Sequence, residues 1–310
     1  MAITIYKTLK IIYDKNVENY KEFLNIIFDG KIYLSNIINN IINVFLCVTF
    51  FIMISGFGAY LAQSFNFNKI LGSGILAILS FFILKNKNGG FAKINEIIIP
   101  ILILFVLIIG IKNIEFISEN KSNILINKSA FWILQAILYA SYNLILTEPV
   151  LISLKKYIQS QKQILFISIG VCIIMILLAG IEFLLLMNVD VDFKSLDMPL
   201  VYVVENKFSK LKLIYGAIIL IAIFTTAISV GNSFLNNVYQ KSKNYPQIVL
   251  ILCITSVIIS PIGFSKLVER LFPLFGFLGI VQVFKIVMYS SKKSKKWIIC
   301  YKIKKILFTK

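Results

Sequence analysis

The segment at residues 138–154, LYASYNLILTEPVLISL, places polar side chains inside an apolar run. Ser141, Tyr142 and Asn143 are consecutive, and Glu148 follows after a short apolar stretch. Hydroxyl and amide groups in apolar surroundings orient small polar ligands. A carboxylate in such a segment costs free energy to bury and therefore marks an ion or substrate pathway. We predict a substrate-binding site at Ser141, Tyr142 and Asn143, with Glu148 as a proton-carrying or gating residue.

Pro149 directly follows this carboxylate. Proline has no N–H, so the carbonyl of Ile145 loses its helical partner, and Glu148 is biased toward an extended conformation. We expect an interrupted helix here, because such breaks surround the binding sites of secondary transporters. The alternative is an ordinary proline kink whose polar side chains are satisfied locally.

A second group of polar side chains lies in the apolar segment AIFTTAISVGNSF. Thr225, Thr226 and Ser229 fall within about one helical turn. Their oxygens are suitable ligands for a small cation such as sodium, so these three residues are candidates for cation binding. The alternative is that the hydroxyls bond to carbonyls of their own helix.

Two further acidic residues stand out. Glu182, in LLAGIEFLLL, is either a buried hydrogen-bonded acid or a second proton-carrying or gating residue. Asp197, followed by Pro199, predicts a capped short helix near 198–206 that covers the outer mouth of the bundle.

Enzymatic chemistry is not indicated. The chain has no histidine, which excludes His-based triads and His metal sites. Its four cysteines are far apart, and no carboxylate pair or nucleophile–base arrangement is evident, so we expect no enzyme activity and no cofactor. The net charge of +18 comes from lysines in short gaps between apolar runs, which argues for membrane topology signals and against nucleic-acid binding.

The elements that position these residues are membrane helices. The chain has 310 residues, 58% of them hydrophobic, and a mean hydropathy of +0.86, which is typical of an integral membrane protein with several spans. We predict eight spans of about the length that crosses a bilayer. They are 38–62, 68–84, 95–111, 131–154, 163–187, 213–238, 246–262 and 271–289.

Lys and Arg are roughly twice as frequent in one set of alternate gaps as in the other, which predicts both termini in the cytoplasm. Residues 1–37 form a cytoplasmic lead-in, with the end of a helix at 1–13 and an amphipathic helix at 17–28. The bundle occupies 38–289, and a basic cytoplasmic tail occupies 290–310. Within the first span, the small residues of SGFGA, at 55–59, predict a close helix contact.

Several quoted segments carry a resemblance to a known family. ILYASYNLILTEPVLISL, DMPLVYVVENKF and IYGAIILIAIFTTAISVGNSF resemble the YkvI-like bacterial membrane proteins. ENYKEFLNIIFDGKI and MISGFGAYLAQSFNF resemble earlier segments of the same family. That family is similar to the amino acid–polyamine–organocation superfamily, whose LeuT-like fold has ten core helices in two inverted repeats.

The resemblance implies that the eight predicted spans are core helices three to ten. The first core helix and most of the second then have no counterpart, so the bundle would be N-terminally incomplete and its activity doubtful. It also implies that Thr225 and Thr226 form half of a sodium site, and that Ser141, Tyr142 and Asn143 form half of a substrate site.

Taken together, the sequence predicts a secondary transporter in the bacterial plasma membrane, coupled to Na⁺ or H⁺ and acting on a small amino-acid-like or zwitterionic solute. Its expected partners are the lipid bilayer and this solute; no partner subunit can be named. The alternative is a solute-sensing membrane subunit of the spore-germination permease type, which binds its solute without moving it.

Overall fold

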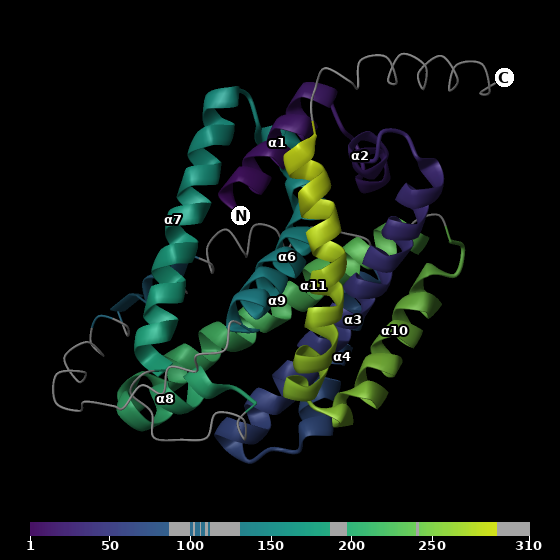
Figure 1. The fold of residues 1–310 in the computed structure, drawn as a ribbon. Helices are drawn as coiled ribbons and strands as arrows, with labels where there is room; N and C mark the ends of the chain where they lie inside the picture. The colour runs from purple at the N-terminus through teal and green to yellow at the C-terminus, as the bar shows by residue number, and fades with distance from the viewer. Residues whose placement is uncertain are drawn as a thin grey trace. The chain divides into compact units, whose positions relative to one another are not determined.

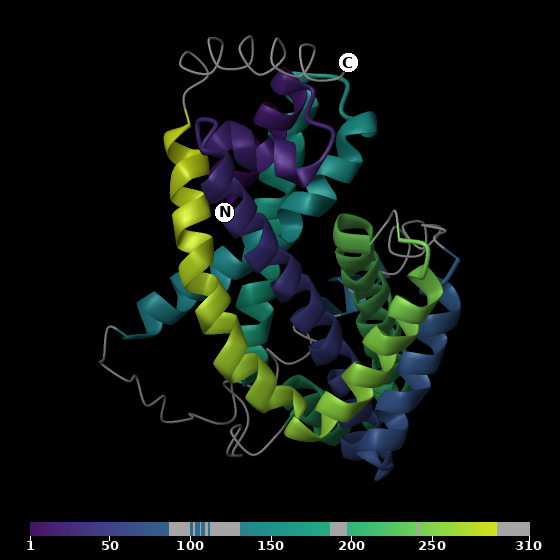
Figure 2. The same cartoon turned by 90° about the vertical axis from the view of Figure 1, so that its right-hand side faces the viewer.

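The computed structural model describes residues 1–86, 100–101, 103–105, 107–108, 111, 131–186, 197–239 and 242–289. In this part of the chain the regular elements are helices, drawn in Figures 1 and 2, which confirms the all-α prediction there. The α-helices are α1 (Ala2–Lys15), α2 (Tyr20–Ile27), α3 (Ile32–Phe65), α4 (Lys69–Leu84), α6 (Phe131–Ser153), α7 (Gln161–Leu186), α8 (Pro199–Lys207), α9 (Lys212–Tyr239), α10 (Tyr245–Ile259) and α11 (Phe264–Met288). Short 3₁₀ helices are η1 (Leu154–Tyr157), η3 (Ser209–Leu211) and η4 (Ser260–Ile262).

Among the described residues, five helical stretches are long and apolar enough to cross a membrane. They lie in α3, α7, α9, α10 continued by η4, and α11, and they correspond to five of the eight predicted spans. The predicted span at 68–84 is the shorter apolar helix α4, and the predicted span at 131–154 is α6, which is not among the five. The predicted span at 95–111 and the predicted tail at 290–310 lie mostly or wholly outside the described residues.

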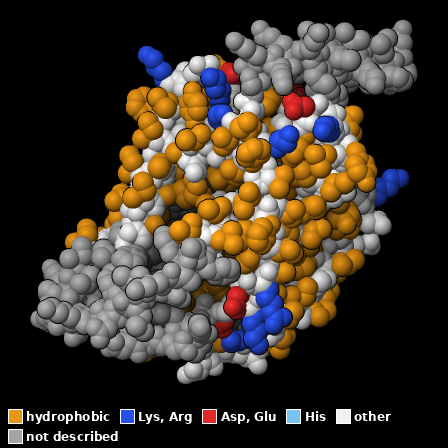
Figure 3. All heavy atoms as spheres, viewed as in Figure 1, with side chains coloured by type: hydrophobic (Ala, Val, Ile, Leu, Met, Phe, Trp, Pro, Cys, Tyr) orange, Lys and Arg blue, Asp and Glu red, His pale blue; other side chains and the backbone are white. Residues whose placement is uncertain are grey.

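Exposed apolar side chains cover these helices. Hydrophobic side chains dominate the face drawn in Figure 3, with few charges among them. Phe166 and Ile176 on α7 are 74% and 67% exposed, and Ile258 on α10 is 71% exposed. Continuous apolar surface on a helix is unusual in water and is expected where lipid surrounds the protein.

The described residues belong to two compact units. Unit 1 comprises Met1–Ile42, Ala130–Cys172 and Phe272–Lys310, and unit 2 comprises Asn43–Ser129 and Ile173–Leu271.

In unit 1, local signals start and stop the two N-terminal helices. Asn16 ends α1 in the left-handed conformation, at φ 54°. The side chain of Asn19 caps α2 by accepting from the N–H of Glu22 at 2.9 Å, while the Glu22 carboxylate accepts from the N–H of Glu18 at 3.0 Å. The residues predicted to share the apolar face of 17–28 are all buried, and they are Val17, Tyr20, Phe23, Leu24, Ile27 and Phe28.

In unit 2, α4, α9 and α10 pack around a core that includes Phe50, Leu76 and Val249. Glycine permits the close contact of α3 with α4, because a Cβ at Gly58 would collide with the carbonyl oxygen of Lys69. The small-residue contact predicted at 55–59 is therefore confirmed.

The predicted interruption in the helix at 131–154 is wrong. α6 is helical from Phe131 to Ser153 with Pro149 inside it. A proline in a membrane helix removes one hydrogen bond, and neighbouring groups can satisfy the freed carbonyl without ending the helix. The alternative given above was a proline kink with polar side chains satisfied locally. In agreement with it, Thr147 donates to the carbonyl of Asn143 in the same helix at 2.7 Å.

Candidate functional site

The candidate site lies where α6 and α11 pack closely together in unit 1. A Cβ at Gly276 would lie 2.8 Å from the carbonyl oxygen of Leu138, and a Cβ at Gly279 would lie 2.7 Å from that of Ser141. Only glycine fits such a contact, since real Cβ atoms do not approach backbone this closely. Both glycines therefore place the α11 backbone directly against α6, and Gln282 follows on the same face three residues later.

Gln282 meets Glu148 and Tyr20 in a buried polar group that we call the Glu148 cluster. The three side chains are 1%, 1% and 4% exposed, respectively. The amide Nε2 of Gln282 donates to Oε2 of Glu148, and also to the hydroxyl of Tyr20 at 2.7 Å. The Tyr20 hydroxyl in turn donates to Oε2 of Glu148 at 3.4 Å. Helices α2, α6 and α11 each contribute one member.

The cluster contains more acceptors than donors. Within the described part of the chain, Oε1 of Glu148 and Oε1 of Gln282 are buried and have no hydrogen-bond partner. Unpartnered buried oxygens are rare in native proteins and cost free energy. The amide of Gln282 is oriented with Nε2 toward Glu148, which suits an ionised carboxylate, because the opposite orientation would point the amide oxygen at it. The arrangement is therefore suited to accept a proton or a cation.

Tyr20 remains a hydrogen-bond donor in this cluster. Burial raises the pKa of its phenol well above the usual range, and the adjacent Glu148 carboxylate raises it further, against the opposing effect of the bond from Gln282. The hydroxyl therefore keeps its proton across the physiological pH range.

The residues predicted to bind substrate lie one to two turns before Glu148 on the same helix. Ser141 is buried and donates to the carbonyl of Ile137 at 2.7 Å. Asn143 donates through Nδ2 to the carbonyl of Tyr139 at 2.8 Å. Tyr142 is also buried, with its ring centroid 4.4 Å from that of Phe272. The three residues thus line different sides of α6, and only Ser141 shares a face with Glu148, since seven residues are two turns.

The candidate cation-binding residues on α9 bond within their own helix. Thr225 and Thr226 donate to the carbonyl of Ala222 at 3.1 and 2.7 Å, and Ser229 donates to that of Thr225 at 2.8 Å. This is the back-bonding that the sequence left open as an alternative. Each hydroxyl oxygen keeps lone pairs, so these bonds do not prevent it from accepting a ligand.

Glu182 lies on α7, and its side chain is outside what the structure describes. Tyr20 and Gln282, by contrast, were not identified as site residues from the sequence. The signal for Gln282 was available: it is a lone amide in the apolar run FGFLGIVQVF. Tyr20 gave no such signal, because a tyrosine on an apolar helix face is ordinary core composition.

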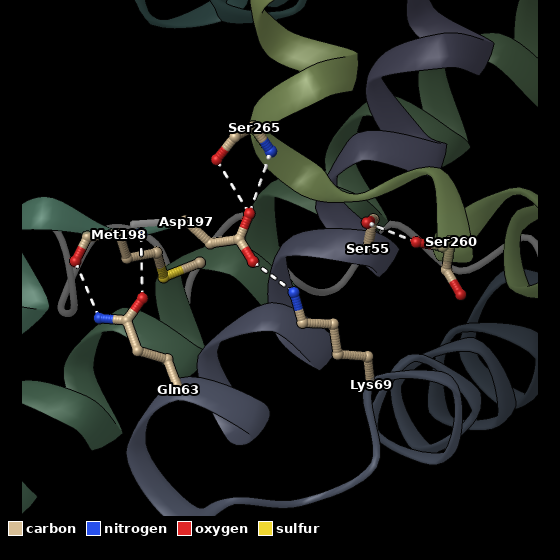
Figure 4. A network of polar contacts seen from close by, with 7 residues as sticks. All are labelled: Ser55, Gln63, Lys69, Asp197, Met198, Ser260 and Ser265. Atoms are coloured by element: carbon tan, nitrogen blue, oxygen red, sulfur yellow. Dashed lines mark hydrogen bonds and ion pairs between the residues drawn. The ribbon is translucent and has the colours of Figure 1, made fainter. Parts of the chain in front are cut away.

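A second polar network lies in unit 2, around Asp197 (Figure 4). Its carboxylate accepts from Lys69 Nζ at 2.6 Å and from the hydroxyl and N–H of Ser265 at 2.9 and 3.4 Å. Burial alone would raise the pKa of Asp197, but the bonds from Lys69 and Ser265 outweigh it and hold the pKa below its usual range. The carboxylate thus joins the first residue of α4 to the first turn of α11.

The helix predicted near 198–206 is present as α8, Pro199–Lys207, but Asp197 does not cap it. Met198 is the N-cap residue and makes no side-chain cap bond. Its backbone pairs instead with Gln63, whose side chain accepts from the Met198 N–H and donates to the Met198 carbonyl, each at 3.1 Å (Figure 4). The start of α8 is therefore fastened to the end of α3.

The five helical stretches that are long and apolar enough to cross a membrane mark a multi-pass integral membrane protein. The chain is 30% identical over 280 residues to the uncharacterized membrane protein YkvI of Bacillus subtilis, covering 86% of this chain and 77% of that protein. The chain belongs to the family of YkvI. It is also 24% identical over 259 residues to the uncharacterized protein YyaD of the same organism, covering 83% of this chain and 75% of the relative. No family model and no solved structure matches the chain.

Proposed function

We propose that the protein is a cation-coupled secondary transporter for a small amino-acid-like or zwitterionic solute, in the bacterial plasma membrane with both termini cytoplasmic. The observation that carries this proposal is Glu148: a carboxylate 1% exposed, on a helix of a multi-pass membrane protein. A buried acid is costly to keep, and transporters keep acids among their helices for ion and substrate pathways.

The solute site lies beside this acid on α6. Ser141 is two turns from Glu148 on the same face, so a solute at Ser141 and an ion at Glu148 would be close enough to affect each other's binding. The side-chain oxygens of Ser141, on the face of Glu148, and of Asn143, on a different side of α6, each retain lone pairs beyond the bonds within the helix. Such oxygens suit a solute ammonium group.

The hydroxyls of Thr225, Thr226 and Ser229 on α9 are a second candidate for the coupling ion, in this case sodium. They would hold the ion through the same lone pairs. A LeuT-like arrangement, in which alternating access moves one repeat of helices against the other, would use both α6 and α9 in this way.

The test is uptake of labelled amino acids by the purified chain in proteoliposomes, with an imposed proton or sodium gradient. We expect accumulation of at least one solute under one gradient, and its loss in Asn143→Leu but not in the matched control Asn86→Leu, whose side chain is exposed in a turn. Absence of uptake by a folded chain under both gradients would overturn the proposal. Solute binding without uptake would instead support a sensing subunit of the spore-germination permease type.

A further inference from the structure

The Glu148 cluster has too few hydrogen-bond donors for its acceptor oxygens. Gln282 uses its amide donor on Glu148 and Tyr20, and Tyr20 uses its single O–H on Glu148. Both bonds to the carboxylate end on Oε2. Among the described residues nothing reaches Oε1 of Glu148, so this oxygen is buried, charged when ionised, and unpartnered.

No cationic side chain that the structure describes compensates the charge of Glu148. Tyr20 of α2 and Gln282 of α11 are the polar groups that act on Glu148 in the described part of the chain. Lys7 of α1 donates instead to the carbonyl of Val287, and Lys285 of α11 lies 6.0 Å from the ring centroid of Phe28. An ionised carboxylate without a counter-charge in a low dielectric is strongly unfavourable, whereas the same group carrying a proton is not.

The number of oxygens in the cluster distinguishes a proton from a metal cation as the ion bound there. Hard metal cations take about six oxygen ligands, whereas the side chains of the cluster hold four oxygens, of which two, on Glu148 and Gln282, have no partner among the described residues. A proton needs one oxygen. On the basis of the proposed function, we infer that the coupling ion is a proton, that Glu148 carries it on Oε1, and that Tyr20 and Gln282 are positioning residues that hold the unprotonated carboxylate.

The step involves no redox chemistry. On loading, water delivers a proton and an O–H bond forms at Oε1, which removes the negative charge. On unloading, that bond breaks and the proton returns to water on the other side, while the donors on Oε2 stabilise the carboxylate left behind. The hydroxyls of Thr225, Thr226 and Ser229 take no part in this step.

Infrared difference spectroscopy of the purified full chain in lipid, titrated with acid, tests this directly. We expect a protonated-carboxyl band that grows as the pH falls, is absent in Glu148→Gln and persists in Glu182→Gln. Tyr20→Phe and Gln282→Leu remove donors to the carboxylate, so each should move the midpoint of the band to higher pH, by about 1 unit. The matched control Gln161→Leu, at an exposed position, should leave the midpoint unchanged.

An unchanged band in Glu148→Gln would overturn the inference, as would a band that sodium removes at constant pH. If Glu148→Gln does not accumulate as folded protein, the midpoints of Tyr20→Phe and Gln282→Leu decide. This measurement needs no transport. A chain that shows the band but no uptake refutes the proposed function alone, and a chain that shows uptake without the band refutes the inference alone.

Discussion

Gln282 on α11 donates a buried hydrogen bond to Glu148 on α6, across 134 positions of the sequence. The contact depends on Gly279 and Gly276, which lie about one and two turns before Gln282 on α11. These glycines bring the backbone of α11 against that of α6. This hydrogen bond joins the two helices. A change in the protonation of Glu148 therefore changes an interaction that holds α11 against α6.

Gln282→Leu should destabilise the protein. Leucine fills a similar volume but removes the amide donor, so Oε2 of Glu148 keeps only the bond from Tyr20. We expect a loss of about 1–3 kcal/mol, the cost of a buried acceptor deprived of its partner. Thermal unfolding in detergent measures it, with Gln161→Leu as the exposed control. Equal melting temperatures for the two variants would mean that the bond is absent in solution.

Gly279→Ala should separate α11 from α6. The new methyl group would lie 2.7 Å from the carbonyl oxygen of Ser141, and backbone cannot rotate away as a side chain can. We expect a destabilisation of about 1–3 kcal/mol, as for other overpacked contacts. Gly170→Ala is the matched control, because nothing lies within 4 Å of the Cβ position there. A tolerated Gly279→Ala would contradict the contact on which the Glu148 cluster depends.

The ion pair of Lys69 with Asp197 should weaken in acid. Because the pKa of Asp197 lies below its usual range in the folded protein, the pair stabilises the fold above the unfolded pKa of about 3.9. That contribution is lost as the pH falls through the folded pKa. Lys69 is half exposed, so the coupling between the two side chains should be about 0.5 kcal/mol.

A double-mutant cycle with Lys69→Met and Asp197→Asn measures this coupling at neutral and acidic pH. Lys210→Met, at an exposed position, is the control. A coupling energy that does not decline in acid would show that the carboxylate is not held by charge.

Thr225→Val should leave the ion dependence of uptake unchanged if the coupling ion is a proton on Glu148. The hydroxyl of Thr225 donates to the carbonyl of Ala222 and takes no part in the Glu148 cluster, and valine preserves the branched shape of the side chain. Uptake measured against the sodium and proton gradients separately checks this. A selective loss of sodium dependence would restore the α9 hydroxyls as the ion site.

The helices were predictable from the sequence because hydrophobic runs are local signals: the span predicted at 213–238 is α9, Lys212–Tyr239. The start of α11 was predicted at 271, whereas the helix begins at Phe264. The Glu148 cluster was only partly predictable. Glu148 stood out as an acid in an apolar run, but its partners lie 128 and 134 residues away, and packing alone brings them together.

Two other expectations show the same limit. Pro149 predicted a break, yet one missing N–H does not end a helix that its neighbours support. Asp197 had the position of a helix cap, but Lys69 and Ser265 bind its carboxylate instead. For Asp197, tertiary contacts decided the outcome against the local preference.

Solute-driven proton flux tests the account most directly. Proteoliposomes that contain the purified chain and an internal pH-sensitive dye are given a solute that the chain accumulates. The account predicts internal acidification that accompanies solute entry, is abolished in Glu148→Gln and persists in Thr225→Val. Solute entry with no change of internal pH, or acidification that is equal in Glu148→Gln, would contradict it.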